Sequence, residues 1–392
     1  MCGKRVNILR IVYDNVKLYK DNRFEVNFIA TDRVSDPEQV YQIYGNVYSQ
    51  KMVALAGINA SGKTSALKLI HWAMTIVLQN DSLNENSIYG RDFVQDGTIL
   101  TVDFYCDNKF YELRSEICIN KVEGTSQQRL YFKDEWIYVK EKSKVHKKND
   151  CLSFEELLYQ RSELKEEVKS VIKDDDSIVI TVTRDNETEL HQLLPFTDIN
   201  LLMATDNIPT DWLHVFDPNL EALKVYKGDN DSDSYQVKFK GWKKAVTFNN
   251  PFMLSNVVSS GTIKGQNLIY HIKKVLKSGG YVIVDELENH LNKELVRMIT
   301  NIFKDENINK NGACLIFSTH YVELLDFVDR KDNIFITRKE PENPMAIEIL
   351  NYAKEVKRND VKKSEVFLSN IIQGTAPRYE YIRALEDSLC EA

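Results

Sequence analysis

The residues with the clearest chemical meaning lie in one glycine-rich stretch, residues 57–64, which reads GINASGKT. It fits the pattern G-x-x-x-x-G-K-[ST], in which backbone N–H groups and the start of a helix hold the phosphates of a nucleotide. The apolar run Met52–Ala56 predicts a buried strand before the loop, and residues 65–70 predict the first turns of a helix after it. In this context, we expect Lys63 to contact the β- and γ-phosphates and Thr64 to bind Mg²⁺.

Two neighbouring carboxylates, Asp285 and Glu286, follow the apolar run Tyr281–Val284, which predicts a second buried strand. Ligands bind beyond the carboxyl ends of parallel strands, so these side chains are expected close to the glycine-rich loop. Asp285 suits a role in holding Mg²⁺, and Glu286 suits a general base that deprotonates the attacking water. Alone, the run could equally be a strand followed by an acidic helix cap, but the loop upstream favours the catalytic interpretation.

Two further stretches give weaker chemical signals. Residues 313–319 predict another buried strand, after which His320 could contact the γ-phosphate and the attacking water. Residues 258–262 place small side chains at the start of a helix, where N–H groups form a second anion site. The ordinary alternatives are a surface histidine and a serine N-cap. The positions of the two stretches on either side of Asp285 and Glu286 favour the functional interpretation.

Together these stretches resemble the ATPase head of ABC-type proteins in the SMC, RecF and OLD group. Asn59 and Ser61 match the loop of that group, G-x-N-x-S-G-K-[ST]. Residues 259–262 are similar to its signature, residues 288–292 to its D-loop, and His320 to its switch histidine. Within the group, the chain looks most like stand-alone OLD-like proteins, many of which are ATPase subunits of bacterial anti-phage or abortive-infection systems.

The resemblance implies an α/β fold, an ABC-type P-loop ATPase head with a mixed and parallel β-sheet flanked by helices and an antiparallel β subdomain. We expect the first part of the head in residues 1–142 and the second part in residues 246–350. A globular α+β insertion, shaped like a lid, would occupy residues 143–245, and a helical tail residues 351–392. This insertion is closer to that of RecF than to the coiled coil of SMC proteins.

Local patterns predict some of the elements outside the motifs. Residues 98–106, 110–119 and 129–139 alternate as three strands with short links, which indicates an antiparallel meander. In the insertion, Ser153 and Glu156 form a capping box that predicts a helix extending to Val171. Residues 177–183 alternate in a way that predicts a strand.

The resemblance also assigns roles to the site residues, with ATP and Mg²⁺ as the cofactors. Glu286 and His320 would be catalytic, and Thr64 and Asp285 would ligate Mg²⁺. ATP would contact two groups of residues: Gly57, Asn59, Ala60, Ser61, Gly62, Lys63, Thr64 and Ser65 in the loop, and Ser259, Ser260, Gly261 and Thr262 in the signature. The two groups would meet across a homodimer, with ATP held between the loop of one protomer and the signature of the other.

The chain departs from the pattern of the family at two positions. Asn292 stands where the D-loop has an aspartate, which puts communication across the dimer in doubt. No glutamine matches the Q-loop clearly, and Gln95 is the nearest candidate.

Composition narrows the class of protein further. The 392-residue chain has a net charge of −7, which argues against a generally basic nucleic-acid-binding surface. Its six cysteines show no C-x-x-C spacing, and no apolar run is long enough to span a bilayer, so we expect a reduced cytoplasmic protein without membrane contact. The densest basic run, residues 140–148, could contact a phosphate backbone or form a solvated loop, and the loop is the more ordinary interpretation.

The sequence therefore predicts a slow ATPase that closes as an ATP-sandwiched homodimer, with a higher oligomer left open. Its expected role is that of sensor or scaffold in an anti-phage system, acting with a separate effector protein, because the tail is too short for a typical independent nuclease domain. The alternative is a RecF-like DNA-repair or chromosome-maintenance ATPase that binds DNA through residues 140–148. A transporter ATPase and a nuclease fit the sequence less well.

Overall fold

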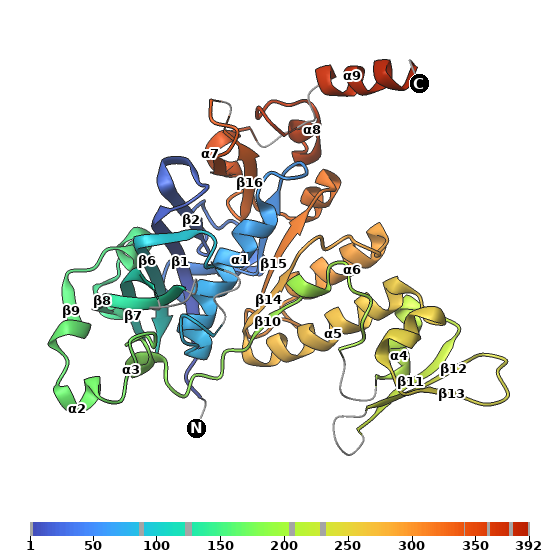
Figure 1. Ribbon diagram of the computed structural model, residues 1–392, viewed down its shortest axis with the longest axis horizontal. Helices are drawn as coiled ribbons and strands as arrows, with labels where there is room; N and C mark the ends of the chain where they lie inside the picture. Colours follow the sequence, from blue (N-terminus) through green and yellow to red (C-terminus); the bar gives the residue numbers. More distant parts are fainter. Residues whose placement is uncertain are drawn as a thin grey trace.

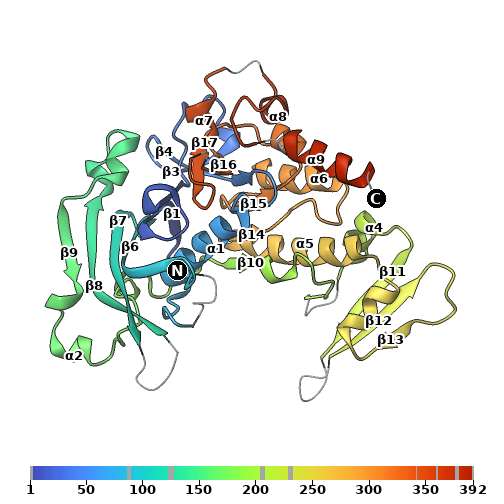
Figure 2. The same ribbon diagram turned by 45° about the horizontal axis from the view of Figure 1, so that its top comes forward.

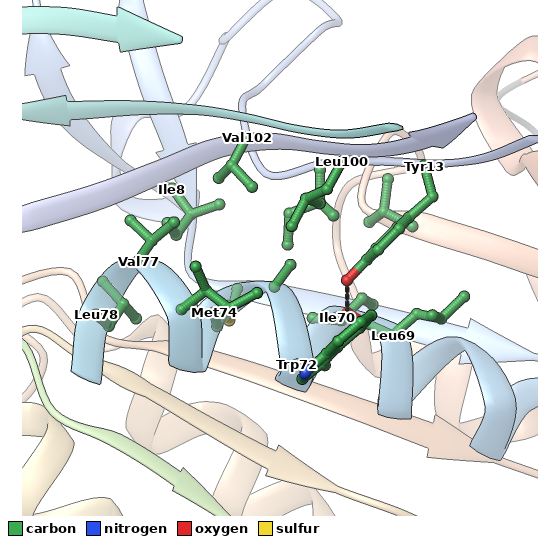
Figure 3. Close-up of a cluster of buried hydrophobic side chains, with 14 of the residues drawn as sticks. Ile8, Tyr13, Leu69, Ile70, Trp72, Met74, Val77, Leu78, Leu100 and Val102 are labelled. Carbon is green, nitrogen blue, oxygen red and sulfur yellow. Dashed lines mark hydrogen bonds between the residues drawn. The ribbon is translucent and has the colours of Figure 1, made fainter. Parts of the chain in front are cut away.

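The computed structural model describes residues 3–85, 90–121, 128–203, 208–227, 233–340, 342–358, 361–375 and 379–390. The two largest sheets of the described chain each have six strands, and helix α1 (Lys63–Met74) packs between them (Figure 1 and Figure 3). The predicted α/β fold, with a parallel sheet flanked by helices and a separate antiparallel sheet, is confirmed.

The mixed sheet contains the strands that precede the predicted site. Its order is β10 (Leu190–Gln192), β14 (Tyr281–Val284), β15 (Cys314–Thr319), β5 (Met52–Ala56), β16 (Ile334–Lys339) and β17 (Ile347–Asn351). All neighbours are parallel except β16 and β17. The central strands are buried on both faces, which explains why the sequence shows continuous apolar runs there.

Helices cover both faces of this sheet. Alternate side chains of β5 point to opposite faces of the sheet. Val53 and Leu55 belong to the core beside α1, whereas Met52 and Ala54 belong to the core of the opposite face. That opposite face is covered by α5 (Ser260–Ser278) and α6 (Lys293–Lys304). Helix α1 continues as a π-helical turn, Thr75–Gln79, and the helix predicted after the glycine-rich loop is confirmed.

The second sheet is antiparallel, as predicted for the meander. Its order is β2 (Arg23–Asn27), β1 (Val6–Val16), β6 (Val94–Cys106), β7 (Lys109–Lys121), β8 (Gln128–Glu141) and β9 (Glu156–Gln160). A small hairpin, β3 (Val40–Tyr44) and β4 (Val47–Gln50), leads into β5. Tyr13 on β1 contacts α1 directly, because its hydroxyl donates to Leu69 O at 3.1 Å and its ring stacks on Trp72 with centroids 6.2 Å apart (Figure 3).

The helix predicted from the capping box at Ser153 is wrong. Residues 156–160 instead form strand β9, which pairs antiparallel with the edge of β8, and helix α2 covers only Glu166–Lys169. Leu157 and Leu158 remain exposed, so no apolar helix face is buried here. The free edge of β8 offers backbone N–H and C=O groups as hydrogen-bond partners. Residues 156–160 pair with this edge and do not form the locally favoured helix.

The strand predicted for residues 177–183 is also wrong, because a short helix, α3 (Ile180–Thr183), forms instead. The buried carboxylate of Glu135 accepts hydrogen bonds from Ser177 Oγ at 2.7 Å and Ile178 N at 2.9 Å. Ser177 Oγ in turn accepts from Val179 N at 3.2 Å. These polar contacts turn the chain where the sequence showed only an alternating pattern.

The predicted insertion is distributed over three places. Strand β9 extends the antiparallel sheet and β10 extends the parallel one. A third part has its own core and consists of α4 (Thr210–Phe216) and a sheet of β11 (Leu220–Tyr226), β12 (Ser234–Phe239) and β13 (Val246–Phe248). Figure 2 shows this part beside α5, away from the antiparallel sheet. The boundaries of a lid-like unit at residues 143–245 stay a prediction.

The tail contains short helices: α7 (Tyr352–Glu355), α8 (Lys363–Leu368) and α9 (Tyr379–Cys390). The C-terminal helix α9 extends away from the two sheets in Figure 1. Within the described ranges of the chain, no helix is long and apolar enough to cross a membrane.

We expect Trp72→Ala to destabilise the protein by about 3–5 kcal/mol, because it empties a fully buried site between the two sheets. Tyr13→Phe keeps the ring and loses only the hydrogen bond to Leu69 O, so it should cost about 1 kcal/mol. Denaturant unfolding of the two variants measures both costs. Equal costs would contradict the packing role of Trp72.

Candidate functional site

The glycine-rich loop connects the end of β5 to the start of α1. Neighbouring atoms leave little room for a side chain at either of its glycines. A Cβ added to Gly57 would lie 2.3 Å from Thr337 O, and one added to Gly62 would lie 2.7 Å from the side chain of Ile347. Gly62 also has a φ of +103°, a backbone conformation that residues other than glycine rarely adopt. The loop therefore packs directly on β16 and β17.

Lys63 reaches back over the loop. Its Nζ donates to Gly57 O at 2.9 Å and Ile58 O at 3.0 Å, and it lies 3.1 Å from His320 Nδ1. Burial lowers the pKa of Lys63, although three carboxylates favour its charged form, those of Asp285, Glu286 and Glu288. A buried ammonium that faces oxygen acceptors is suited to bind phosphate oxygens at the same place.

Asp285 lies beside Thr64, as predicted for an Mg²⁺ site. Thr64 Oγ1 donates to Asp285 Oδ2 at 2.7 Å, and Ser318 Oγ donates to Asp285 Oδ1. Both groups are oxygen ligands, which Mg²⁺ prefers, and Mg²⁺ in such sites takes its remaining ligands from phosphates and water. In the part of the chain that the structure describes, no group of three His, Cys, Asp or Glu side chains could hold a metal ion alone. Thr64 and Asp285 therefore fit a Mg²⁺ ion that arrives with a nucleotide.

The two predicted catalytic residues, Glu286 and His320, are in direct contact. His320 Nε2 lies 2.9 Å from Glu286 Oε1, and His320 Nδ1 faces Lys63, so the imidazole connects the carboxylate to the glycine-rich loop. Glu286 has a φ of 49°, in the left-handed region that is uncommon for residues other than glycine. Its backbone N–H donates to Ser318 Oγ at 2.8 Å, and this contact helps to hold the conformation.

The signature residues lie apart from the loop of the same chain. Ser259 is the N-cap of α5, where its Oγ accepts from Thr262 N at 3.1 Å. Ser260 Oγ lies 3.2 Å from His290 Nδ1, and a Cβ added to Gly261 would lie 2.5 Å from His290 O. The described contacts of residues 259–262 thus join α5 to the loop after Glu286, not to residues 57–64.

The two departures from the family pattern have structural roles. Asn292 is the N-cap of α6, since its Oδ1 accepts from Leu295 N at 2.9 Å. Gln95 lies in β6 and donates to Asn15 Oδ1, on the antiparallel sheet.

Three residues that sequence reasoning missed belong to the site. Ser318 bridges the carboxylate of Asp285 and the N–H of Glu286, and its signal was a hydroxyl within the apolar run of β15. Glu288 Oε1 accepts from His320 N at 2.7 Å. Lys264, on α5, donates to Glu286 O at 3.1 Å, and burial lowers the pKa of its ammonium to about 8. Nothing in the local sequence marks Lys264 as a neighbour of Glu286.

A family model described as "AAA domain, putative AbiEii toxin, Type IV TA system" matches residues 52–326. The chain belongs to this AAA-domain family. The matched range begins at β5 and extends beyond His320, so it includes every motif of the site. No curated protein matches the chain in sequence. The AAA-domain assignment agrees with the P-loop ATPase fold and with the loop geometry around Lys63.

Lys63→Ala should weaken binding of ATP at least 100-fold, because it removes the buried ammonium that faces the loop carbonyls. Lys68→Ala, on the same helix, is the matched control and should bind ATP like the wild type. Titration with a fluorescent ATP analogue measures both affinities. Unchanged affinity of the Lys63 variant would show that the loop does not bind nucleotide through this residue.

Proposed function

We propose that the protein is a slow, Mg²⁺-dependent ATPase whose bound nucleotide closes a homodimer. The observation that carries this proposal is one connected set of side chains. Lys63 contacts His320, His320 contacts Glu286, and Thr64 contacts Asp285 at the ends of three neighbouring parallel strands. Membership of an AAA-domain family supports the same chemistry.

In the hydrolysis that we propose, an oxygen atom of water bonds to the γ-phosphorus as the bond from that phosphorus to the β–γ bridging oxygen breaks. Glu286 accepts the proton of the water, and ADP and phosphate leave. His320 keeps the carboxylate of Glu286 directed toward the end of the loop. Lys63 binds oxygens of the β- and γ-phosphates, and Mg²⁺ held by Thr64 and Asp285 would supply further positive charge there.

The position of the signature supports the proposed homodimer. Ser259 caps α5 and Ser260 begins it. Within one chain, Ser260 contacts His290, and the described hydrogen bonds of these two serines do not reach the glycine-rich loop. In a two-fold dimer, the start of α5 of a second copy could bind the γ-phosphate, with its N–H groups as donors. ATP would then stabilise the closed dimer more than ADP does, because only ATP carries the group that the second copy contacts.

Glu286→Gln should accumulate an ATP-bound dimer, since the amide cannot accept the proton of the water while the loop still binds nucleotide. Light scattering with ATP measures the dimer, and release of phosphate should fall at least 100-fold. Adding Ser260→Arg to this variant should return it to a monomer that still binds ATP, because the larger side chain blocks closure at the start of α5. A dimer that persists in the double variant would exclude the sandwich.

We also propose that this switch belongs to a bacterial defence module with a separate effector. The family description names a toxin of a type IV toxin–antitoxin system, which supports a role in this kind of biology. The tail beyond β17 contributes the short helices α7, α8 and α9 in its described part. In this proposal, a separate chain supplies the toxic or nucleolytic activity.

Expression together with the neighbouring genes should protect a bacterial host from phage, and Lys63→Ala should remove this protection because it removes ATP binding. Expression of the chain alone should not slow growth, and plaque counts and growth curves measure the two effects. Growth arrest by the chain alone, without any neighbour, would contradict a separate effector.

DNA binding through the basic run 140–148 has less support. Four of the five lysines of this run already have local partners: Lys140 with Asp150 O, Lys142 with Asn108, Lys144 with Glu156, and Lys148 with Thr31 O. Binding to a phosphate backbone would have to replace these contacts. Stimulation of ATP hydrolysis by duplex DNA that weakens with salt would nevertheless favour the RecF-like alternative.

A further inference from the structure

Lys264 connects the signature helix to the catalytic loop of the same chain. It lies one turn after Ser260 on α5, and its Nζ donates to Glu286 O at 3.1 Å. Four carboxylates attract this ammonium, with Glu288 the strongest: Glu288, Glu286, Asp285 and Asp198. This half-buried ammonium donates to the backbone of the proposed general base, and no described hydrogen bond joins it to residues 57–64. The contact is therefore suited to position the backbone of Glu286.

A second contact joins the same two elements. Ser260 Oγ lies 3.2 Å from His290 Nδ1, and Gly261 packs so closely on His290 O that an added Cβ would lie 2.5 Å from it. Both ends of the loop 286–290 have left-handed backbone, with φ of 49° at Glu286 and 63° at His290. The first two turns of α5 thus contact both ends of a short loop whose backbone conformation is uncommon.

The middle of this loop reaches the catalytic pair. Glu288 Oε1 accepts from the backbone N–H of His320 at 2.7 Å, and the ring of His320 contacts the side chain of Glu286 at 2.9 Å. Glu288 is buried, and among the described residues its Oε2 has no hydrogen-bond partner. Movement of α5 relative to the loop 286–290 would therefore displace Glu286 directly and His320 through Glu288.

We propose that Lys264 is a positioning residue that couples the signature turn of each protomer to the general base of that same protomer. This inference depends on the proposed ATP sandwich, in which the signature turn contacts the nucleotide bound by the other copy. ATP in one site would then order Glu286 in the other site through Ser260, α5 and Lys264. Hydrolysis would be positively cooperative, and each site would respond to the occupancy of its neighbour.

Lys264→Met tests this coupling. It should lower the kcat for ATP hydrolysis about 100-fold, since small displacements of a catalytic group cost that much. The Hill coefficient for ATP should fall from above one toward one, while ATP affinity and the ATP-dependent dimer of the variant stay like the wild type. Lys264→Arg keeps the charge and a donor, so it should recover much of the kcat and the cooperativity. Lys277→Met, exposed on the last turn of α5, is the matched control and should change none of these quantities.

His290→Ala provides a second variant that does not remove a buried charge, because His290 is exposed. It should lower the Hill coefficient with a smaller loss of kcat, since Lys264 still contacts Glu286. Normal kcat and normal cooperativity in a folded Lys264→Met dimer would overturn the coupling and leave the proposed ATPase intact. If Lys264→Met fails to fold, normal cooperativity in His290→Ala overturns it. If the wild type neither dimerises with ATP nor hydrolyses it, the proposed function fails, and the coupling fails with it.

Discussion

Parallel pairing of β14, β15 and β5 is the constraint on which the site depends. The register places Val284 beside Phe317 and Thr319 beside Ala56, so the three strands end at nearly the same level of the sheet. The residues that follow each strand must then meet, whatever their separation along the chain. The glycine-rich loop, Asp285 and His320 are neighbours for this reason.

The same register explains the polar contacts within the site. Asp285 follows the residue that pairs with Phe317, so Ser318 lies across from it and donates to its carboxylate. Ser318 also accepts from the N–H of Glu286, at the residue where the backbone turns into the left-handed region. One buried hydroxyl therefore orients the residue suited to hold Mg²⁺ and the backbone of the proposed general base. A strand shifted by one residue would lose both contacts.

Helix α1 connects this edge to the rest of the molecule. Its first residues, Lys63 and Thr64, belong to the site, whereas its later residues, such as Trp72, pack against the antiparallel sheet. The phosphate-binding end of the helix is thus anchored by a large apolar core at its other end. Rigid support of this kind keeps the N–H groups of the loop in position for a charged ligand without further reorganisation.

Sequence by itself determined the elements whose signal is local: the strand, loop and helix around Lys63, the apolar runs of β14 and β15, and the residues that end them. Period and turn chemistry are properties of neighbouring residues, so they can be read without a structure. The tertiary structure decided what depends on distant partners. Residues 156–160 form strand β9 and not the predicted helix, because they pair with the free edge of β8. Residues 180–183 form helix α3 and not the predicted strand, because buried Glu135 binds Ser177 just before them. The tertiary structure also brought Ser318, Glu288 and Lys264 to the site. The hydroxyl within the apolar run of β15 is a local signal, but the partners of all three residues are set by sheet register and helix packing.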